Sequence, residues 1–203
     1  ARNDWQSGDG RSLVSVIDIS DPAGTMIEGA EIRTEGRVES QFNMDLRGGV
    51  LRVVSANAWG SAGNVNHLET FDATDLQNLR RIDHETFGAN EDLYATLFLD
   101  DAGFFVTYFR TDPFHAFRID DRGDATEMSE FVVSGWNDFF RATFGGTRLV
   151  GIGTNDQGGW TMAVSLYDIT DLENPNPLIA RREVQAQSSW SEASWDHRAF
   201  TAL

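Results

Sequence analysis

The sequence contains no cysteine, and it contains no lysine among its 203 residues. Without cysteine the chain forms no disulfide, no thiolate metal site and no cysteine nucleophile. Without lysine it has no Gly-rich phosphate-binding loop that ends in lysine. All 16 basic residues are arginine, against 32 acidic residues, and the formal net charge is −16. This charge excludes a broad nucleic-acid-binding surface, which needs clustered basic side chains, and it disfavours anionic membranes.

Long apolar runs are also absent. No window reaches the ~18 consecutive apolar residues of a membrane-spanning helix, so we expect no membrane insertion. The first residues, Ala1–Asp4, include no initiator methionine and show no signal-peptide pattern. The last residues, 199–203, have the pattern of a strand interior. We therefore expect a processed or excised chain.

Short stretches in which apolar and polar residues alternate dominate the sequence. Clear examples are Leu51–Val54, Phe104–Phe109 and Ala163–Tyr167, separated by clusters of Gly, Asp and Asn. Period-two alternation is typical of half-buried strands, and such clusters suit hairpin turns. Helical patterns are weak, and with 40% hydrophobic residues the chain has enough apolar side chains for a packed core. The prediction is an all-β fold.

An internal repeat refines this prediction. Four segments share an apolar strand that ends in an Asp-bearing turn, and these turns recur about every 50 residues. Their last aspartates are Asp21, Asp75, Asp121 and Asp171. A second marker follows each of them by roughly 20 residues, at Phe42, Leu97, Phe144 and Trp195. A repeat of this length that holds four short strands is typical of a β-propeller blade.

The predicted strands divide the chain into an extension, three complete blades and two partial blades. In chain order the expected parts are the extension 1–12, the partial blade 13–35, the blades 36–90, 91–136 and 137–187, and the partial blade 188–203, with its strands near 191–197 and 198–203. The two partial blades could together close a ring of four blades. We favour an arc of a larger ring, whose remaining blades come from the same parent protein or from another chain, because a blade buries its faces only against neighbours.

Several segments also resemble a known family. They are residues 36–45, 49–53, 106–113, 149–153, 166–175 and 191–200, in order along nearly the whole chain. They are similar to the secreted bacterial and archaeal beta-propeller domain that is distantly related to WD repeats. In that family proline usually follows the corner aspartate, whereas here only Asp21 is followed by one, Pro22. The resemblance implies a propeller exported to the cell exterior and no assigned enzymatic activity.

The corner aspartates are the first candidate site. Aspartate accepts hydrogen bonds from backbone N–H groups two residues further on, so we expect these four to cap turns rather than to bind a metal. The loop 154–160 is rich in side-chain oxygens, and Asp156 there is a weak calcium candidate. Trp160 in the same loop could stack on a sugar or anchor a protein. Arg110 and Asp112 could line the mouth of a central channel.

No catalytic motif is visible. The four histidines lack the spacing of metal ligands, so we expect neither a metal site nor a cofactor, with calcium the one weak alternative. We interpret the chain as a non-catalytic, extracellular binding or scaffold module for a protein or polysaccharide partner. The alternatives are a carbohydrate-active hydrolase or lyase with acidic channel residues, and a structural assembly protein of the cell envelope.

Overall fold

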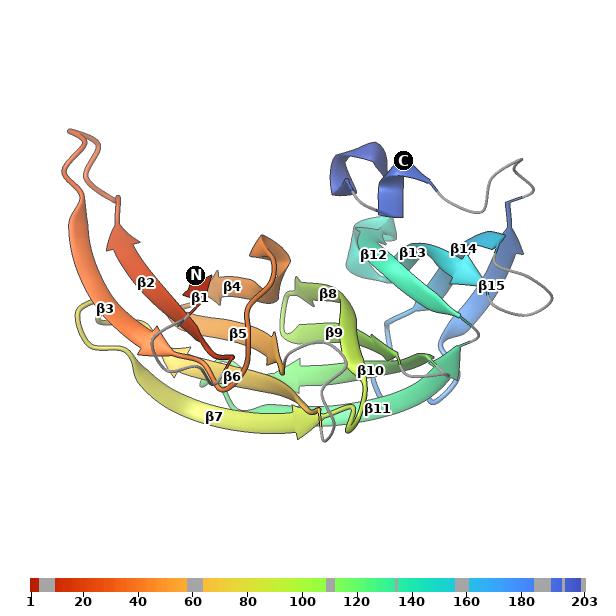
Figure 1. Cartoon of the computed structure of the whole chain (residues 1–203), viewed down its shortest axis with the longest axis horizontal. Helices are drawn as coiled ribbons and strands as arrows, with labels where there is room; N and C mark the ends of the chain where they lie inside the picture. Colours follow the sequence, from red (N-terminus) through yellow and green to blue (C-terminus); the bar gives the residue numbers. More distant parts are fainter. Residues whose placement is uncertain are drawn as a thin grey trace. The chain divides into compact units, whose positions relative to one another are not determined.

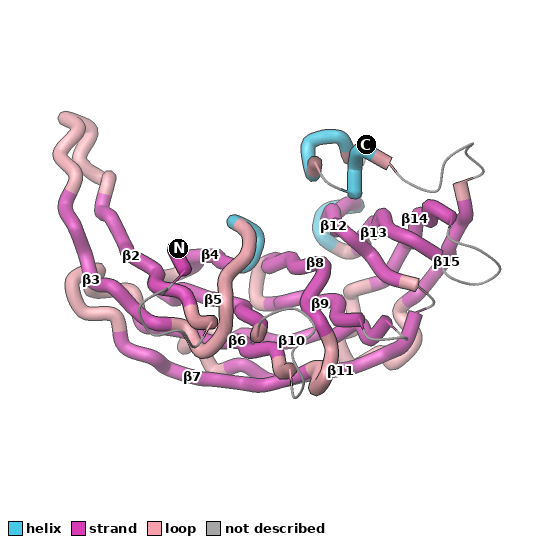
Figure 2. Tube along the Cα trace, in the orientation of Figure 1, coloured by secondary structure: helices cyan, strands magenta, loops and turns pink. Residues whose placement is uncertain are grey.

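The structure is a computed structural model, and it describes residues 1–3, 10–57, 64–108, 112–133, 135–155, 161–184, 191–194 and 196–201. Antiparallel sheets make up nearly all of the regular structure, which confirms the all-β prediction (Figures 1 and 2). Helical structure in the described ranges is limited to short 3-10 turns. Among these ranges no helix has the length and apolar character needed to cross a membrane.

The first sheet has three strands in the order β1-β2-β3. They are β1 (Arg2–Asn3), β2 (Ser12–Asp18) and β3 (Ile27–Arg33). Arg2 pairs with Leu13 across β1 and β2. Part of the expected extension, 1–12, therefore contributes a strand to this sheet.

Each of the other three sheets has four strands that follow one another in sequence, as expected for blades (Figure 1). The second contains β4 (Met44–Arg47), β5 (Val50–Ala56), β6 (Asn66–Asp72) and β7 (Arg80–Phe87). The third contains β8 (Asp92–Leu99), β9 (Ala102–Tyr108), β10 (Asp112–Ile119) and β11 (Ala125–Val133). The fourth contains β12 (Trp136–Thr143), β13 (Arg148–Asn155), β14 (Thr161–Asp168) and β15 (Leu178–Glu183).

The C-terminal residues differ from the prediction. Where two strands were expected after 190, the described residues form the 3-10 turns η3 (Glu192–Ser194) and η4 (His197–Ala199) (Figure 2). The Asp196 side chain accepts a hydrogen bond from the Arg198 N–H at 3.0 Å, and the Asp196 N–H donates to the Glu192 carbonyl. Local bonds of this kind compete with strand pairing for the backbone groups.

Two further 3-10 turns occupy the position of the second repeat marker. These are η1 (Gln41–Asn43) and η2 (Phe144–Gly146). Phe144 is 72% exposed and has a φ of 50°, and Gly145 follows it with a φ of 67°. Strand β12 therefore ends at Thr143. At these two repeats the marker falls in a turn, whereas Leu97 lies on strand β8.

The chain forms two compact units, residues 1–92 with 119–126, and residues 93–118 with 127–203. Alternating strand residues fill a separate core in each. The core of the first unit is mainly aliphatic, around Val53 and Phe71. The core of the second is aromatic: the Phe114 ring centroid lies 4.5 Å from that of Phe131 and 5.2 Å from that of Tyr167. Aromatic pairs contribute roughly 0.5–1.5 kcal/mol each beyond the area they bury.

The corner loops join the last two strands of a sheet, and three of them also form hydrogen bonds to a neighbouring sheet. In the first unit the Ala30 N–H of β3 donates to the Leu76 carbonyl at 2.7 Å, and the Thr70 hydroxyl of β6 donates to the Gly123 carbonyl at 2.5 Å. In the second unit the Ser129 hydroxyl of β11 donates to the Leu172 carbonyl at 2.7 Å. In each case the corner of one sheet packs onto the sheet that precedes it in sequence.

Candidate functional site

The corner aspartates form short local turns. Asp21 Oδ1 accepts the Ala23 N–H at 2.8 Å, and the same bond recurs at Asp75 with Gln77 and at Asp171 with Glu173. At the third corner the acceptor is Asp120 rather than the expected Asp121. Asp120 Oδ1 accepts N–H groups from Arg122 and Asp124, because this turn begins one residue earlier and closes with Gly123 donating to the Asp120 carbonyl.

A second aspartate, three residues earlier, strengthens three of the four corners. Asp18, Asp72 and Asp168 each accept the N–H of the residue two positions on. Hydrogen bonds from the Thr74 hydroxyl and N–H, together with Arg80, lower the pKa of Asp72 to about 2. The corners are thus held by paired turns, and these bonds explain why an acidic residue recurs there.

The sequence-predicted ligand-binding residues lie where the structure gives no side-chain description. Arg110, Asp156 and Trp160 fall outside the described residues, and so does the side chain of Asp112. Trp195, the fourth of the second repeat markers, also lies outside them. These residues stay predictions.

A polar position inside the third strands is the feature that sequence reasoning missed. Ser15, Glu69, His115 and Ser165 occupy it, each two residues before the repeat-equivalent apolar residues Ile17, Phe71, Phe117 and Tyr167. Glu69, His115 and Ser165 are at most 1% exposed. In three sheets this side chain bonds to the last strand of the sheet: Ser15 to Glu31, Glu69 to Arg81, and His115 to Glu127.

Glu69 anchors a charged cluster in the first unit. Its carboxylate accepts the Glu35 N–H at 2.8 Å and lies 3.3 Å from Arg81 Nη1. The same Arg81 nitrogen lies 2.9 Å from Glu35 Oε1, and Arg11 lies 3.0 Å from Glu35 Oε2. The hydrogen bond from Arg81 lowers the pKa of Glu35. The bonds satisfy a buried charge that would otherwise be strongly destabilising.

A pair of histidines lies on the same two strands. Glu69 and His84 are direct cross-strand partners, and His67 Nδ1 lies 3.0 Å from His84 Nε2. Burial, with the nearby His84 imidazole as the next cause, lowers the pKa of His67. His67 therefore resists protonation beside a cluster that holds opposite charges.

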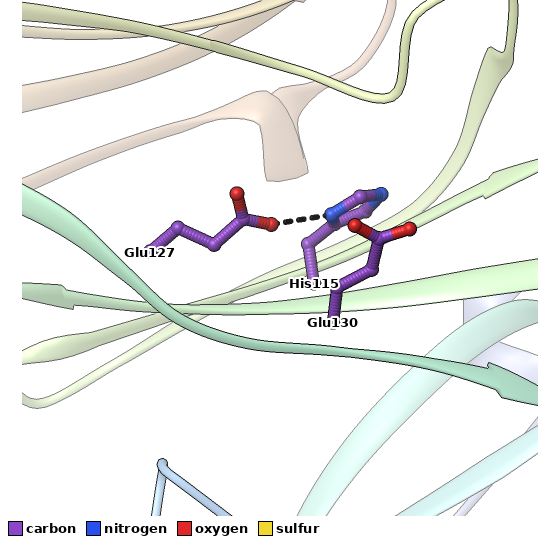
Figure 3. Close-up of side chains that lie close together, drawn as sticks. All are labelled: His115, Glu127 and Glu130. Carbon is purple, nitrogen blue, oxygen red and sulfur yellow. Dashed lines mark hydrogen bonds and ion pairs between the residues drawn. The ribbon is translucent and has the colours of Figure 1, made fainter. Parts of the chain in front are cut away.

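Among the described residues, the second unit holds a cluster of three side chains that could ligate a metal, shown in Figure 3. His115 Nε2 lies 3.1 Å from the Thr107 hydroxyl oxygen, and His115 Nδ1 lies 2.6 Å from Glu127 Oε1. Glu130 completes the group: one ligand atom from each of His115, Glu127 and Glu130 lies within 4.8 Å of the others. One nitrogen and two carboxylate oxygens could hold a metal ion.

Sequence spacing did not reveal this cluster. His115 is on β10 and both glutamates are on β11, so they meet through strand pairing rather than through helical spacing. Both strands lie within the blade predicted at 91–136. The sequence signal that could have found the cluster is a histidine on one predicted strand followed by two glutamates on the next strand of the same blade.

The comparisons identify the family to which these sheets belong. The family model of the beta propeller domain matches residues 4–203. The chain belongs to this beta propeller family. It is 30% identical over 165 residues to an uncharacterized protein of Archaeoglobus fulgidus, covering 81% of this chain and 24% of the relative. It is 27% identical over 170 residues to an uncharacterized protein of Methanocaldococcus jannaschii, covering 83% and 26%. The propeller chain spans about a quarter of each relative.

Proposed function

We propose that this propeller chain is a non-catalytic, extracellular binding or scaffold module whose first sheet docks onto a further blade. The blade-like sheets and the family assignment support a propeller, and propellers serve many unrelated activities. The proposal therefore depends on one observation about the surface of the first sheet.

This observation is the exposure of the first corner. Ile17 is 56% exposed, whereas the residues at its position in the other three repeats, Phe71, Phe117 and Tyr167, are 4%, 1% and 0% exposed. Ile19, two residues further along, is 71% exposed. We call the residues 17–27 the first corner.

The first corner is also apolar beyond these two positions. Met26 and Ile27 are 73% and 51% exposed, and adjoining exposed apolar residues mark interaction sites. The corners led by Leu76 and Leu172 each pack onto the sheet that precedes them. By analogy, the first corner packs against the outer strand of a further blade, where the outer strand is the last strand of a sheet, as β3 and β11 are. The matched region covers about a quarter of each relative, which leaves length for further blades in such chains.

The family resemblance supports the extracellular location, and the charge of the chain supports the binding role. The family resemblance is to secreted propellers. The net charge of −16 creates a field that favours cationic partners and divalent ions. A protein or polysaccharide partner would bind through loops at one face of the assembled ring.

The test is the solution mass of the purified chain by light scattering. In this preparation only second copies can supply outer strands, so the wild type should appear as a multiple of 22.6 kDa. Ile19→Asp should give a monomer, because it places a charge in the docking surface. Leu46→Asp is the matched control, since Leu46 is 59% exposed in the same unit but lies on β4. A wild-type monomer at all concentrations would contradict the proposal.

A further inference from the structure

We propose that His115, Glu127 and Glu130 form a binding site for a divalent transition-metal ion, with Zn²⁺ as the best-matched ion. This site is separate from the first corner and does not depend on the docking of further blades. It uses one nitrogen ligand from β10 and two oxygen ligands from β11.

The ligand atoms already converge. All three lie within 4.8 Å of one another, and Figure 3 shows both carboxylates beside the imidazole ring. Side chains three residues apart in a regular strand point to opposite faces, so the joint approach of Glu127 and Glu130 to one ring is a specific arrangement. Zinc holds nitrogen and oxygen ligands at about 2.0–2.2 Å. The exposed glutamates can reach these distances by rotating their side-chain torsions.

The Thr107 hydroxyl fixes the orientation of the His115 ring. His115 is 1% exposed and Thr107 is 0% exposed, and their side chains lie 3.1 Å apart. When His115 Nε2–H donates to the Thr107 oxygen, Nδ1 carries the lone pair that faces the glutamates. Metal-ligating histidines nearly always have their second nitrogen fixed in this way.

Charge favours a cation at this position. The cluster carries two carboxylates and at most one positive charge, on a protonated His115. A divalent ion balances the two carboxylates while His115 stays neutral. Because one ligand is an imidazole nitrogen, the site suits zinc and its neighbours better than calcium or magnesium, which prefer oxygen ligands. Three protein ligands leave a fourth tetrahedral position for water.

The test uses the full chain, stripped with a chelator and titrated with Zn²⁺ by calorimetry. Millimolar Mg²⁺ is present throughout so that diffuse binding to the acidic surface is saturated. We expect one Zn²⁺ per chain. Glu130→Gln should weaken binding at least about 10-fold, and Thr107→Val should weaken it by about 10-fold through loss of histidine orientation. Glu173→Gln, an exposed glutamate in the same unit, is the charge-matched control and should bind as the wild type does.

Cobalt gives a second readout. Co²⁺ in the wild-type site should show visible d–d absorption, which Glu130→Gln should change and Glu173→Gln should not. Both glutamates are exposed, so their variants avoid the folding risk of replacing buried His115. The proposal is overturned if the wild type shows no saturable Zn²⁺ binding, or if Glu130→Gln and Glu173→Gln bind with the same affinity.

Discussion

The Nδ1 atom of His67 lies 3.0 Å from the Nε2 atom of His84, across strands β6 and β7. Burial lowers the pKa of His67, and the neighbouring imidazole lowers it further. In the unfolded chain His67 titrates near its ordinary value of 6.5. Below that pH the unfolded state binds a proton that the native state resists, so this histidine makes the native state less stable as pH falls.

The first prediction concerns the pH dependence of stability that His67 causes. The free energy of unfolding should fall as pH drops from 7 toward 5, and urea denaturation at a series of pH values measures it. In His67→Gln this pH dependence should be shallower, whatever the overall stability of the variant. An unchanged slope in that variant would show that His67 does not titrate differently in the two states.

The second prediction concerns the aromatic core. Tyr167 is fully buried, and its hydroxyl accepts a hydrogen bond from Asn137 Nδ2 at 3.0 Å. Tyr167→Phe keeps the ring but leaves the buried amide without this partner, which should cost roughly 1–3 kcal/mol of unfolding free energy. Tyr108→Phe, at a half-buried tyrosine of the same unit, is the control and should change stability by less than about 0.5 kcal/mol. Equal effects of the two substitutions would disprove a role for the hydroxyl.

The third prediction separates two adjacent aspartates. Asp120 accepts two backbone N–H groups at its corner. Asp120→Ala should therefore lower the unfolding free energy by about 1 kcal/mol, a typical net value for a hydrogen bond. Asp121→Ala should stay within about 0.5 kcal/mol of the wild type. The reverse order in thermal or urea denaturation would place the turn one residue later than the structure does.

The blade-like order of the strands was predictable because period-two alternation identifies half-buried strands. The described part of the predicted stretch 104–109, for example, lies within β9. The repeat also located the corners, with an error of one residue at Asp121. This error arose because consecutive aspartates, Asp120 and Asp121, offer equivalent side chains to the turn.

The remaining features depend on contacts that a repeat pattern does not encode. The C-terminal turn η4 is held by the Asp196 side chain, which accepts the Arg198 N–H, in a segment whose composition also suits a strand. Phe144 repeats at the marker position but adopts a left-handed φ of 50°. The His115 cluster depends on which residues of β10 and β11 face each other, and that register follows from packing rather than from spacing.

The central claim is that the first corner is a docking surface for an outer strand, and amide hydrogen exchange of residues 17–27 tests it most directly. Exchange is measured at a protein concentration where the chain is dilute and at one where light scattering gives a multiple of 22.6 kDa. The account predicts that these amides exchange at least about 10-fold more slowly in the associated sample, and that Ile19→Asp abolishes the difference. Exchange at residues 17–27 that is the same at both concentrations would contradict it.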